Sequence, residues 1–178
     1  MLNDVEKILL SEKDIEEICT RLGKQISDDY RGKPLVLVGL LKGCNPFLSD
    51  LAKKITIPLE INYMKASSYE GTESSGNIRI TLDLDIDVMD KHILLVEDIV
   101  DTGSTLTKVV GNLNYRLPKS IKVVTLLDKP EGRIVPFEAD YVGSLIPKEF
   151  VIGYGLDYNE KYRNLPFIGV LKKEVYAK

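Results

Sequence analysis

The sequence is poor in the residues that support zinc or thiol chemistry. Its 178 residues include one histidine, two cysteines and no tryptophan. A single histidine, His92, cannot form a His-rich zinc site, and Cys19 and Cys44 stand far apart without a C-x-x-C pair, so structural zinc is not expected. Because the start, Met1 to Asp4, leads straight into charged residues, nothing indicates a secretory signal, and we predict a cytoplasmic location.

Long hydrophobic runs and an excess of positive charge are also missing. The longest apolar run, around 35–41, is far shorter than the roughly 18 residues that predict a membrane-spanning helix. A formal net charge of −3, with 29% charged and 44% hydrophobic residues, is typical of a globular protein that does not bind nucleic acid. No repeat or low-complexity linker interrupts the sequence, so we expect a single domain, 1–178, without a nucleic-acid or membrane partner.

Hydrophobic periodicity predicts helices and strands in alternation. Ser11 and Asp14 resemble a capping box, and the apolar spacing after them predicts a helix that ends near Gly32. A second helix is expected with Asn45 as its N-cap and Pro46 as its first residue, and a third after the turn that follows residue 96. Strands are expected at 35–41, 59–63, 78–86, 93–96 and 121–127, with shorter β segments at 150–152 and 167–171. This alternation predicts an α/β fold with a mostly parallel central sheet flanked by helices.

The strongest chemical signal is the segment from Val96 to Thr105, where a buried strand is expected to end and a helix to begin. Ligands bind at this edge of a parallel sheet. Thr102, Gly103, Ser104 and Thr105 would present consecutive backbone N–H groups and hydroxyls at a helix N-terminus. Such a cradle suits a phosphate monoester.

Three carboxylates, Glu97, Asp98 and Asp101, stand directly before this cradle. They would repel a phosphate unless they bind sugar hydroxyls, hold Mg²⁺ or accept a proton, so the combination indicates a phosphorylated sugar. The alternative, that they only cap a turn, is disfavoured because buried acids without partners are costly. Two other phosphate motifs are excluded: no G-x-x-x-x-G-K-[ST] occurs, and the glycines at 153 and 155 lack the third glycine of a dinucleotide fingerprint.

The segment 97–105 resembles the phosphoribosyl pyrophosphate (PRPP) binding motif of type I phosphoribosyltransferases. Four further segments resemble the hypoxanthine-guanine phosphoribosyltransferase family, in order along nearly the whole chain. They are GLLKG at 39–43, SSY at 67–69 with GTESSG at 71–76, LDKP at 127–130, and FVIGYGLD at 150–157 with YR at 162–163. The PRPP motif indicates only the superfamily, and the last two segments indicate a purine substrate. The resemblance implies the type I phosphoribosyltransferase fold, with a small base-binding hood formed by the N- and C-terminal segments.

The resemblance also assigns roles to the PRPP motif. Residues 102–105 would hold the 5′-phosphate, while Glu97 and Asp98 would bind the ribose hydroxyls and Mg²⁺. Asp101 would accept the proton from N7 of the purine as the base becomes nucleophilic. The implied reaction transfers 5-phosphoribose from PRPP to N9 of hypoxanthine or guanine, giving IMP or GMP and pyrophosphate.

Other roles follow for the remaining segments. The resemblance implies that Lys42, the backbone of Gly43 and Arg163 bind pyrophosphate, and the peptide before Lys42 is often cis in relatives. Lys129 would donate a hydrogen bond to the 6-oxo group of the base, which disfavours the amino group of adenine.

Three residues near the end of the chain would read the purine. Phe150 would stack on the base, and the backbone of Val151 and the carboxylate of Asp157 would bind its edge. The resemblance also gives Asp157 a share in holding a second Mg²⁺. From residue type alone, Phe150 would instead belong to the core.

The residues allow alternatives for the segment 66–77 and for the function. Residues 66–77 are polar, and the resemblance makes them a flexible active-site loop that excludes water, although their composition fits a hairpin connection equally well. The alternatives to the implied function are a xanthine-preferring or other phosphoribosyltransferase, and a non-catalytic regulator that senses PRPP. Relatives are usually homodimers or homotetramers.

Overall fold

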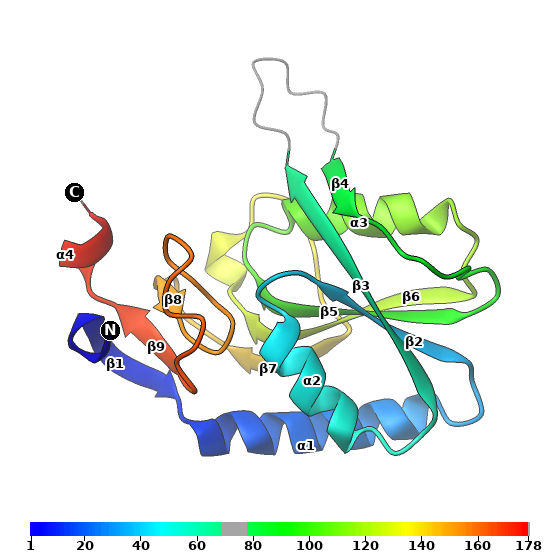
Figure 1. Ribbon diagram of the computed structural model, residues 1–178, viewed down its shortest axis with the longest axis horizontal. Coiled ribbons are helices and arrows are strands. Elements are labelled where there is room, and N and C mark those ends of the chain that lie inside the picture. The colour runs from blue at the N-terminus through cyan, green and yellow to red at the C-terminus, as the bar shows by residue number, and fades with distance from the viewer. Residues whose placement is uncertain (69–77, 178) are drawn as a thin grey trace.

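The structure is a computed structural model that describes residues 1–68 and 78–177 (Figure 1). Its main sheet has six strands in the order β4-β3-β2-β5-β6-β7. The strands are β2 (Leu35–Leu40), β3 (Leu59–Ser68), β4 (Ile78–Leu82), β5 (His92–Val100), β6 (Ser120–Asp128) and β7 (Tyr141–Leu145). All neighbouring strands are parallel except β3 and β4, which run antiparallel. The predicted mostly parallel sheet is therefore confirmed.

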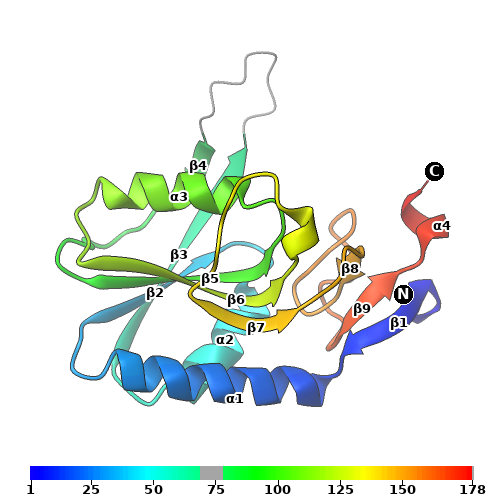
Figure 2. The same ribbon diagram turned by 180° about the vertical axis from the view of Figure 1, so that it is seen from behind.

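Helices cover both faces of this sheet (Figures 1 and 2). On one face α1 (Glu12–Asp29) and α2 (Asn45–Lys54) pack against Leu35 and Leu37 of β2 and Leu94 of β5. On the other face α3 (Ser104–Asn114) packs against the alternate residues of the same strands, including Val36 and Ile93. Because consecutive strand residues point to opposite faces, a strand covered on both sides must be apolar throughout, which explains its continuous hydrophobic run.

A second, three-stranded sheet joins the two ends of the chain. Its order is β1-β9-β8, with β1 (Val5–Leu10) antiparallel to β9 (Ile168–Leu171) and β9 antiparallel to β8 (Val151–Ile152). In both views it lies beyond one end of the main sheet, and the two termini lie close together (Figures 1 and 2). This is the hood that the resemblance implied. Three short helices complete the fold: η1 (Leu2–Asp4), η2 (Pro130–Gly132) and α4 (Lys173–Tyr176).

The helix predictions need two corrections. The capping box of Ser11 and Asp14 is present, but α1 ends at Asp29 rather than near Gly32. The second helix begins one residue earlier than expected: Cys44 is its N-cap and Asn45 is already helical. The reason is that the N–H of Leu48 bonds to the carbonyl of Cys44 at 2.8 Å, so the helical pattern starts there.

The strand predictions were wrong at several boundaries. Strand β5 continues to Val100, so Glu97 and Asp98 lie within the strand and not in the turn after it. Strand β4 ends at Leu82, where its pairing with β3 ends. The alternating residues beyond it, up to Ile86, were wrongly predicted as part of the strand. Strands β1 and β7 were not predicted at all. No helix among the described residues is long and apolar enough to cross a membrane.

The predicted active-site loop at 66–77 also changes. Its first residues, from Ala66 to Ser68, continue strand β3 and pair with β4, with Ala66 opposite Ile80. The loop prediction therefore started three residues too early. The rest of that prediction, 69–77, lies outside the described residues.

Candidate active site

The predicted site residues gather at the carboxyl edge of three neighbouring strands. Lys42 follows β2, Asp101 follows β5 and Lys129 follows β6. The chain leaves β2 towards β3 on one side, and leaves β5 towards β6 on the other side. Strand order therefore reverses between β2 and β5, and the crevice at such a reversal is where α/β proteins bind ligands.

The turn after β5 supplies an anion site at the start of α3. Gly103 is the N-cap, with φ = 81°, a left-handed conformation that glycine adopts without steric cost. The Ser104 N–H donates to Oγ1 of Thr102 at 3.3 Å, and Ser104 begins the helix. The first N–H groups of a helix lack intrahelical acceptors and carry partial positive charge. With no acid in the first turn of α3, this terminus can hold a phosphate.

Glu97 and Asp98 form a pair of adjacent, half-buried carboxylates at the end of β5. The pKa of Asp98 is raised to about 6, chiefly by burial and to a smaller extent by nearby Asp157, while backbone hydrogen bonds and Arg163 oppose the rise. Burial and the charge of Asp98 also raise the pKa of Glu97 well above its ordinary value. Desolvated like charges of this kind are stabilised by a divalent cation.

The described residues hold no cluster of three or more His, Cys, Asp or Glu side chains that could bind a metal alone. Mg²⁺ is usually held by one or two carboxylates together with water and substrate phosphates. The three predicted ligands, Glu97, Asp98 and Asp157, lie on β5 and on the segment after β8. Glu97 and Asp98 fit such a partial set.

The loop after β2 passes so close to the Glu97–Asp98 pair that position 43 has no room for a side chain. A Cβ atom at Gly43 would overlap the carboxylate of Asp98. The Leu41–Lys42 peptide just before it is cis, as the resemblance implied for relatives. A Cβ at Gly155 would likewise overlap the carbonyl oxygen of Gly43, so the hood packs directly against this loop.

The proposed base and the proposed purine reader are in direct contact. Nζ of Lys129 lies 2.6 Å from Oδ2 of Asp101. The Lys129 side chain is only 12% exposed, whereas that of Asp101 is 43% exposed. The two side chains therefore lie side by side at the carboxyl ends of β5 and β6.

Arg133 holds this corner together, although it was not predicted from the sequence. Its guanidinium donates to the carbonyl oxygens of Val100 and Asp101, both at 2.7 Å, and to that of Lys129 at 3.2 Å. It also pairs with the carboxylate of Asp128, and both side chains are largely buried. One arginine thus joins the ends of β5 and β6. A single arginine in a polar segment carries no local signal for such a role.

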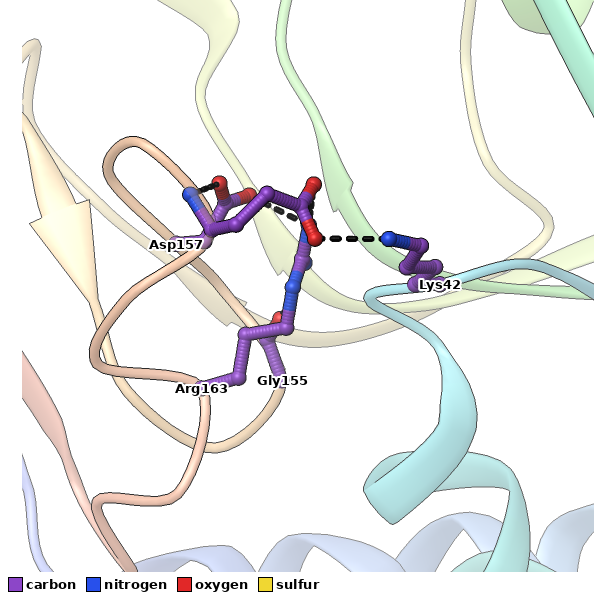
Figure 3. A network of polar contacts seen from close by, with 5 residues as sticks. Lys42, Gly155, Asp157 and Arg163 are labelled. Atoms are coloured by element: carbon purple, nitrogen blue, oxygen red, sulfur yellow. Dashed lines mark hydrogen bonds and ion pairs between the residues drawn. The ribbon is translucent and has the colours of Figure 1, made fainter.

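The hood contributes a second charged cluster (Figure 3). Arg163 donates to the carbonyl oxygen of Gly155 at 2.7 Å, and its Nη2 lies 2.8 Å from Oδ1 of Asp157. Lys42 is joined to this cluster through Glu160, whose carboxylate lies 2.6 Å from the lysine Nζ. Predicted pyrophosphate ligands from opposite ends of the sequence are therefore brought together. Glu160 was not predicted; it lies between the two parts of the last segment that carried the resemblance, 150–157 and 162–163.

Phe150 and Val151 lie in the hood. Val151 is 7% exposed and pairs with Val170 in the small sheet. Phe150 is 38% exposed, and its ring stacks on Tyr176 with 4.9 Å between centroids and meets Tyr158 edge to face. The expectation from residue type that Phe150 belongs to the core is therefore wrong, and its stacking on a purine stays a prediction.

Two hollows occur in the surface of the described residues. One, of about 670 Å³, is lined by Asp128, Arg133 and Phe137 beside the crevice. The other, of about 660 Å³, lies between α1 and α2, with Cys19 and Lys53 in its lining. Neither hollow is lined by a predicted site residue, so the candidate site is defined by the side chains at the strand edge and not by either hollow.

Comparison with known proteins identifies the class that this fold and site define. Residues 6–159 match the model of the phosphoribosyl transferase domain. A hypoxanthine-guanine phosphoribosyltransferase of Staphylococcus aureus is 53% identical over 178 residues, which cover 99% of each chain. The bifunctional protein TilS/HprT of Listeria innocua is 51% identical over 99% of this chain, which spans only 28% of that longer protein.

Solved structures agree with the sequence relatives. The crystal structure of a hypoxanthine phosphoribosyltransferase from S. aureus has a TM-score of 0.96 and 52% identity, covering 100% of this chain and 97% of that one. A substrate complex of the Trypanosoma cruzi enzyme has a TM-score of 0.93 and 45% identity, with 98% and 99% covered. The chain belongs to the phosphoribosyltransferase family and, within it, to the hypoxanthine-guanine phosphoribosyltransferases.

This result confirms the type I phosphoribosyltransferase fold and the enzyme class that the resemblance implied. These relatives support purine salvage by phosphoribosyl transfer. They give no support to the alternatives, a phosphoribosyltransferase of another specificity or a non-catalytic PRPP sensor.

Proposed function

We propose that this chain transfers 5-phosphoribose from PRPP to N9 of hypoxanthine or guanine, releasing pyrophosphate and forming IMP or GMP. The observation that carries the proposal is the crevice between β2 and β5, where an anion-binding helix start, a carboxylate pair and the Asp101–Lys129 contact meet at one strand edge. A phosphorylated sugar whose leaving group is also anionic matches these charges.

The roles divide along the site. Residues 102–105 bind the 5′-phosphate through backbone N–H groups and hydroxyls. Glu97 and Asp98 accept hydrogen bonds from the ribose hydroxyls. Asp101 takes the N7 proton while Lys129 donates to the 6-oxo group, so that electron density can flow to N9. Phe150, the backbone of Val151 and Asp157 complete the purine site.

Pyrophosphate is held from the opposite side of the crevice. Lys42, the backbone of Gly43 and Arg163 bind its oxygens, and their charges offset the charge that grows on the leaving group. Glu97, Asp98 and Asp157 are the residues that would hold Mg²⁺, which when bound neutralises diphosphate charge. No covalent nucleophile is required, because positioning and electrostatics supply the rate enhancement.

Three predictions go beyond the family assignment: the extent of the catalytic unit, the oligomeric state and the location in the cell. We propose that 1–178 acts as one catalytic unit and assembles into a homodimer or homotetramer, as relatives of this family usually do. The cytoplasmic location stays a prediction.

The proposed function is tested by a spectrophotometric assay with PRPP, Mg²⁺ and five bases in parallel. Hypoxanthine and guanine should react, and adenine should not, because Lys129 can only donate hydrogen bonds. Uracil should not react because a pyrimidine has neither N7 nor N9. Xanthine also carries a 6-oxo group, so its rate tests the alternative specificity. Turnover of adenine at the rate of hypoxanthine would contradict the proposal, as would PRPP binding without reaction of any base.

A further inference from the structure

Glu160 bridges the two side-chain cations that the proposed function assigns to pyrophosphate. Its Oε2 lies 2.6 Å from Nζ of Lys42, and its Oε1 lies 3.0 Å from Nη2 of Arg163 (Figure 3). Each carboxylate oxygen therefore contacts one cation, and the two cations come from segments 121 residues apart in the sequence. A diphosphate would make contacts of this kind.

The backbone at Glu160 is unusual for a glutamate. Asn159 and Glu160 have φ values of 51° and 61°, and the flanking residues Tyr158 and Lys161 exchange two backbone hydrogen bonds of 3.1–3.2 Å. This is the pattern of a two-residue hairpin turn with positive φ at both central positions, where glycine is the favoured second residue. A non-glycine residue in this region carries a conformational cost, and such a cost is found most often at functional positions.

The cations would keep different numbers of partners without Glu160. Arg163 would retain Asp157 at 2.8 Å and the carbonyl oxygen of Gly155 at 2.7 Å, so its position does not depend on Glu160. Among the described residues, Glu160 is the only ion-pair partner found for Lys42.

We infer that Glu160 occupies the pyrophosphate position in the substrate-free enzyme and must be displaced when the diphosphate binds. This inference rests on the proposed function and deepens it. In the empty site, Glu160 offsets the repulsion between Lys42 and Arg163. When the diphosphate is present, the same carboxylate competes for both cations. Glu160 therefore weakens the binding of pyrophosphate and promotes its release.

The direct test is a calorimetric titration of Mg²⁺-pyrophosphate into the wild-type chain and a Glu160→Gln variant. Glutamine keeps the size and the turn but loses the charge. The variant should bind pyrophosphate about 2- to 30-fold more tightly, the range expected for the removal of two exposed ion pairs. Product inhibition by pyrophosphate should strengthen by the same factor, while the KM for hypoxanthine should not change.

Two further variants control this experiment. Glu17→Gln removes an equal charge from α1, where the side chain is 68% exposed compared with 63% for Glu160, and pyrophosphate binding should stay at the wild-type level. Glu160→Gly removes the carboxylate and relieves the positive φ, so it should fold at least as well as wild type and also bind pyrophosphate more tightly.

The outcomes separate this inference from the proposed function. Unchanged pyrophosphate affinity in both Glu160 variants of an active enzyme would overturn the inference alone. Weaker affinity would also overturn it, because Glu160 would then position the cations instead of competing for them. Failure of the wild-type chain to form IMP from PRPP and hypoxanthine would instead overturn the proposed function.

Discussion

Lys129 and Asp101 form a 2.6 Å ion pair across the carboxyl ends of β5 and β6. The contact places the proposed proton acceptor beside the proposed reader of the 6-oxo group. In a purine, N7 and the 6-oxo oxygen are neighbouring atoms on one edge. We therefore expect the pair to present an acceptor and a donor to that edge, and the arriving base to exchange the ion pair for two hydrogen bonds.

Replacement of Asp101 by Asn should remove the base and keep the shape. A general base typically contributes about 10²–10⁴-fold, so kcat should fall by that factor while the KM for PRPP stays close to wild type. Steady-state kinetics with hypoxanthine measure both constants. Asp87→Asn, a change at an exposed acid before β5, serves as the control and should leave kcat unchanged. A near-normal kcat for Asp101→Asn would exclude this role.

Substitution of Lys129 by Met should separate base recognition from PRPP binding. Methionine keeps much of the buried stem and loses the ammonium. A hydrogen bond to a charged group is worth about 1.5–3 kcal/mol, so the KM for hypoxanthine should rise about 10- to 100-fold. The KM for PRPP should change far less. Equal increases in the two KM values would show that Lys129 does not read the purine.

Arg133→Met should destabilise the protein through the corner that this arginine supports. The change leaves the largely buried carboxylate of Asp128 without its ion-pair partner. Loss of one partner of a buried pair lowers the free energy of unfolding by about 3–5 kcal/mol. Thermal unfolding should show Tm lower by roughly 6–20 °C. Arg116→Met, which breaks an exposed pair with Asp83, should cost less than about 1 kcal/mol. Similar Tm values for the two variants would contradict the role of Arg133.

Gly43→Ala and Gly111→Ala form a matched pair of glycine substitutions. A Cβ at Gly43 overlaps the Asp98 carboxylate, so the loop after β2 must move, and misplacement of about 1 Å can cost about 10²-fold in kcat/KM. A Cβ at Gly111, on the exposed side of α3, meets no atom within 4 Å. That change should leave activity intact and stabilise the helix by about 0.5–1 kcal/mol. Full activity of Gly43→Ala would contradict the packing described here.

The sequence predicted the centre of the fold better than its edges. Strands β2, β5 and β6 are apolar because helices cover both of their faces, so their pattern is local and readable. Strand β1 pairs with β9, more than 150 residues away, and among the described strands β9 is its only ladder partner. Strand β7 is short, and its Gly143 packs against the backbone of Leu126, a contact with no sequence signal.

The same distinction holds within the candidate site. The phosphate cradle and Asp101 belong to one contiguous motif, so local sequence was enough to propose them. Arg133 donates to backbone carbonyl oxygens, and Glu160 pairs with the Lys42 ammonium. Only the tertiary fold brings these partners together. The ring of Tyr176 against Phe150 could not be foreseen either, because α4 reaches the hood through the pairing of β9 with β1.

The central claim is that this strand edge transfers phosphoribose to a 6-oxopurine. Its most direct test is to measure nucleotide and pyrophosphate together after the protein is mixed with PRPP, Mg²⁺ and hypoxanthine. We expect IMP and pyrophosphate in a 1:1 ratio, with little pyrophosphate when the base is omitted. Pyrophosphate release without IMP, or no release with any base, would contradict it.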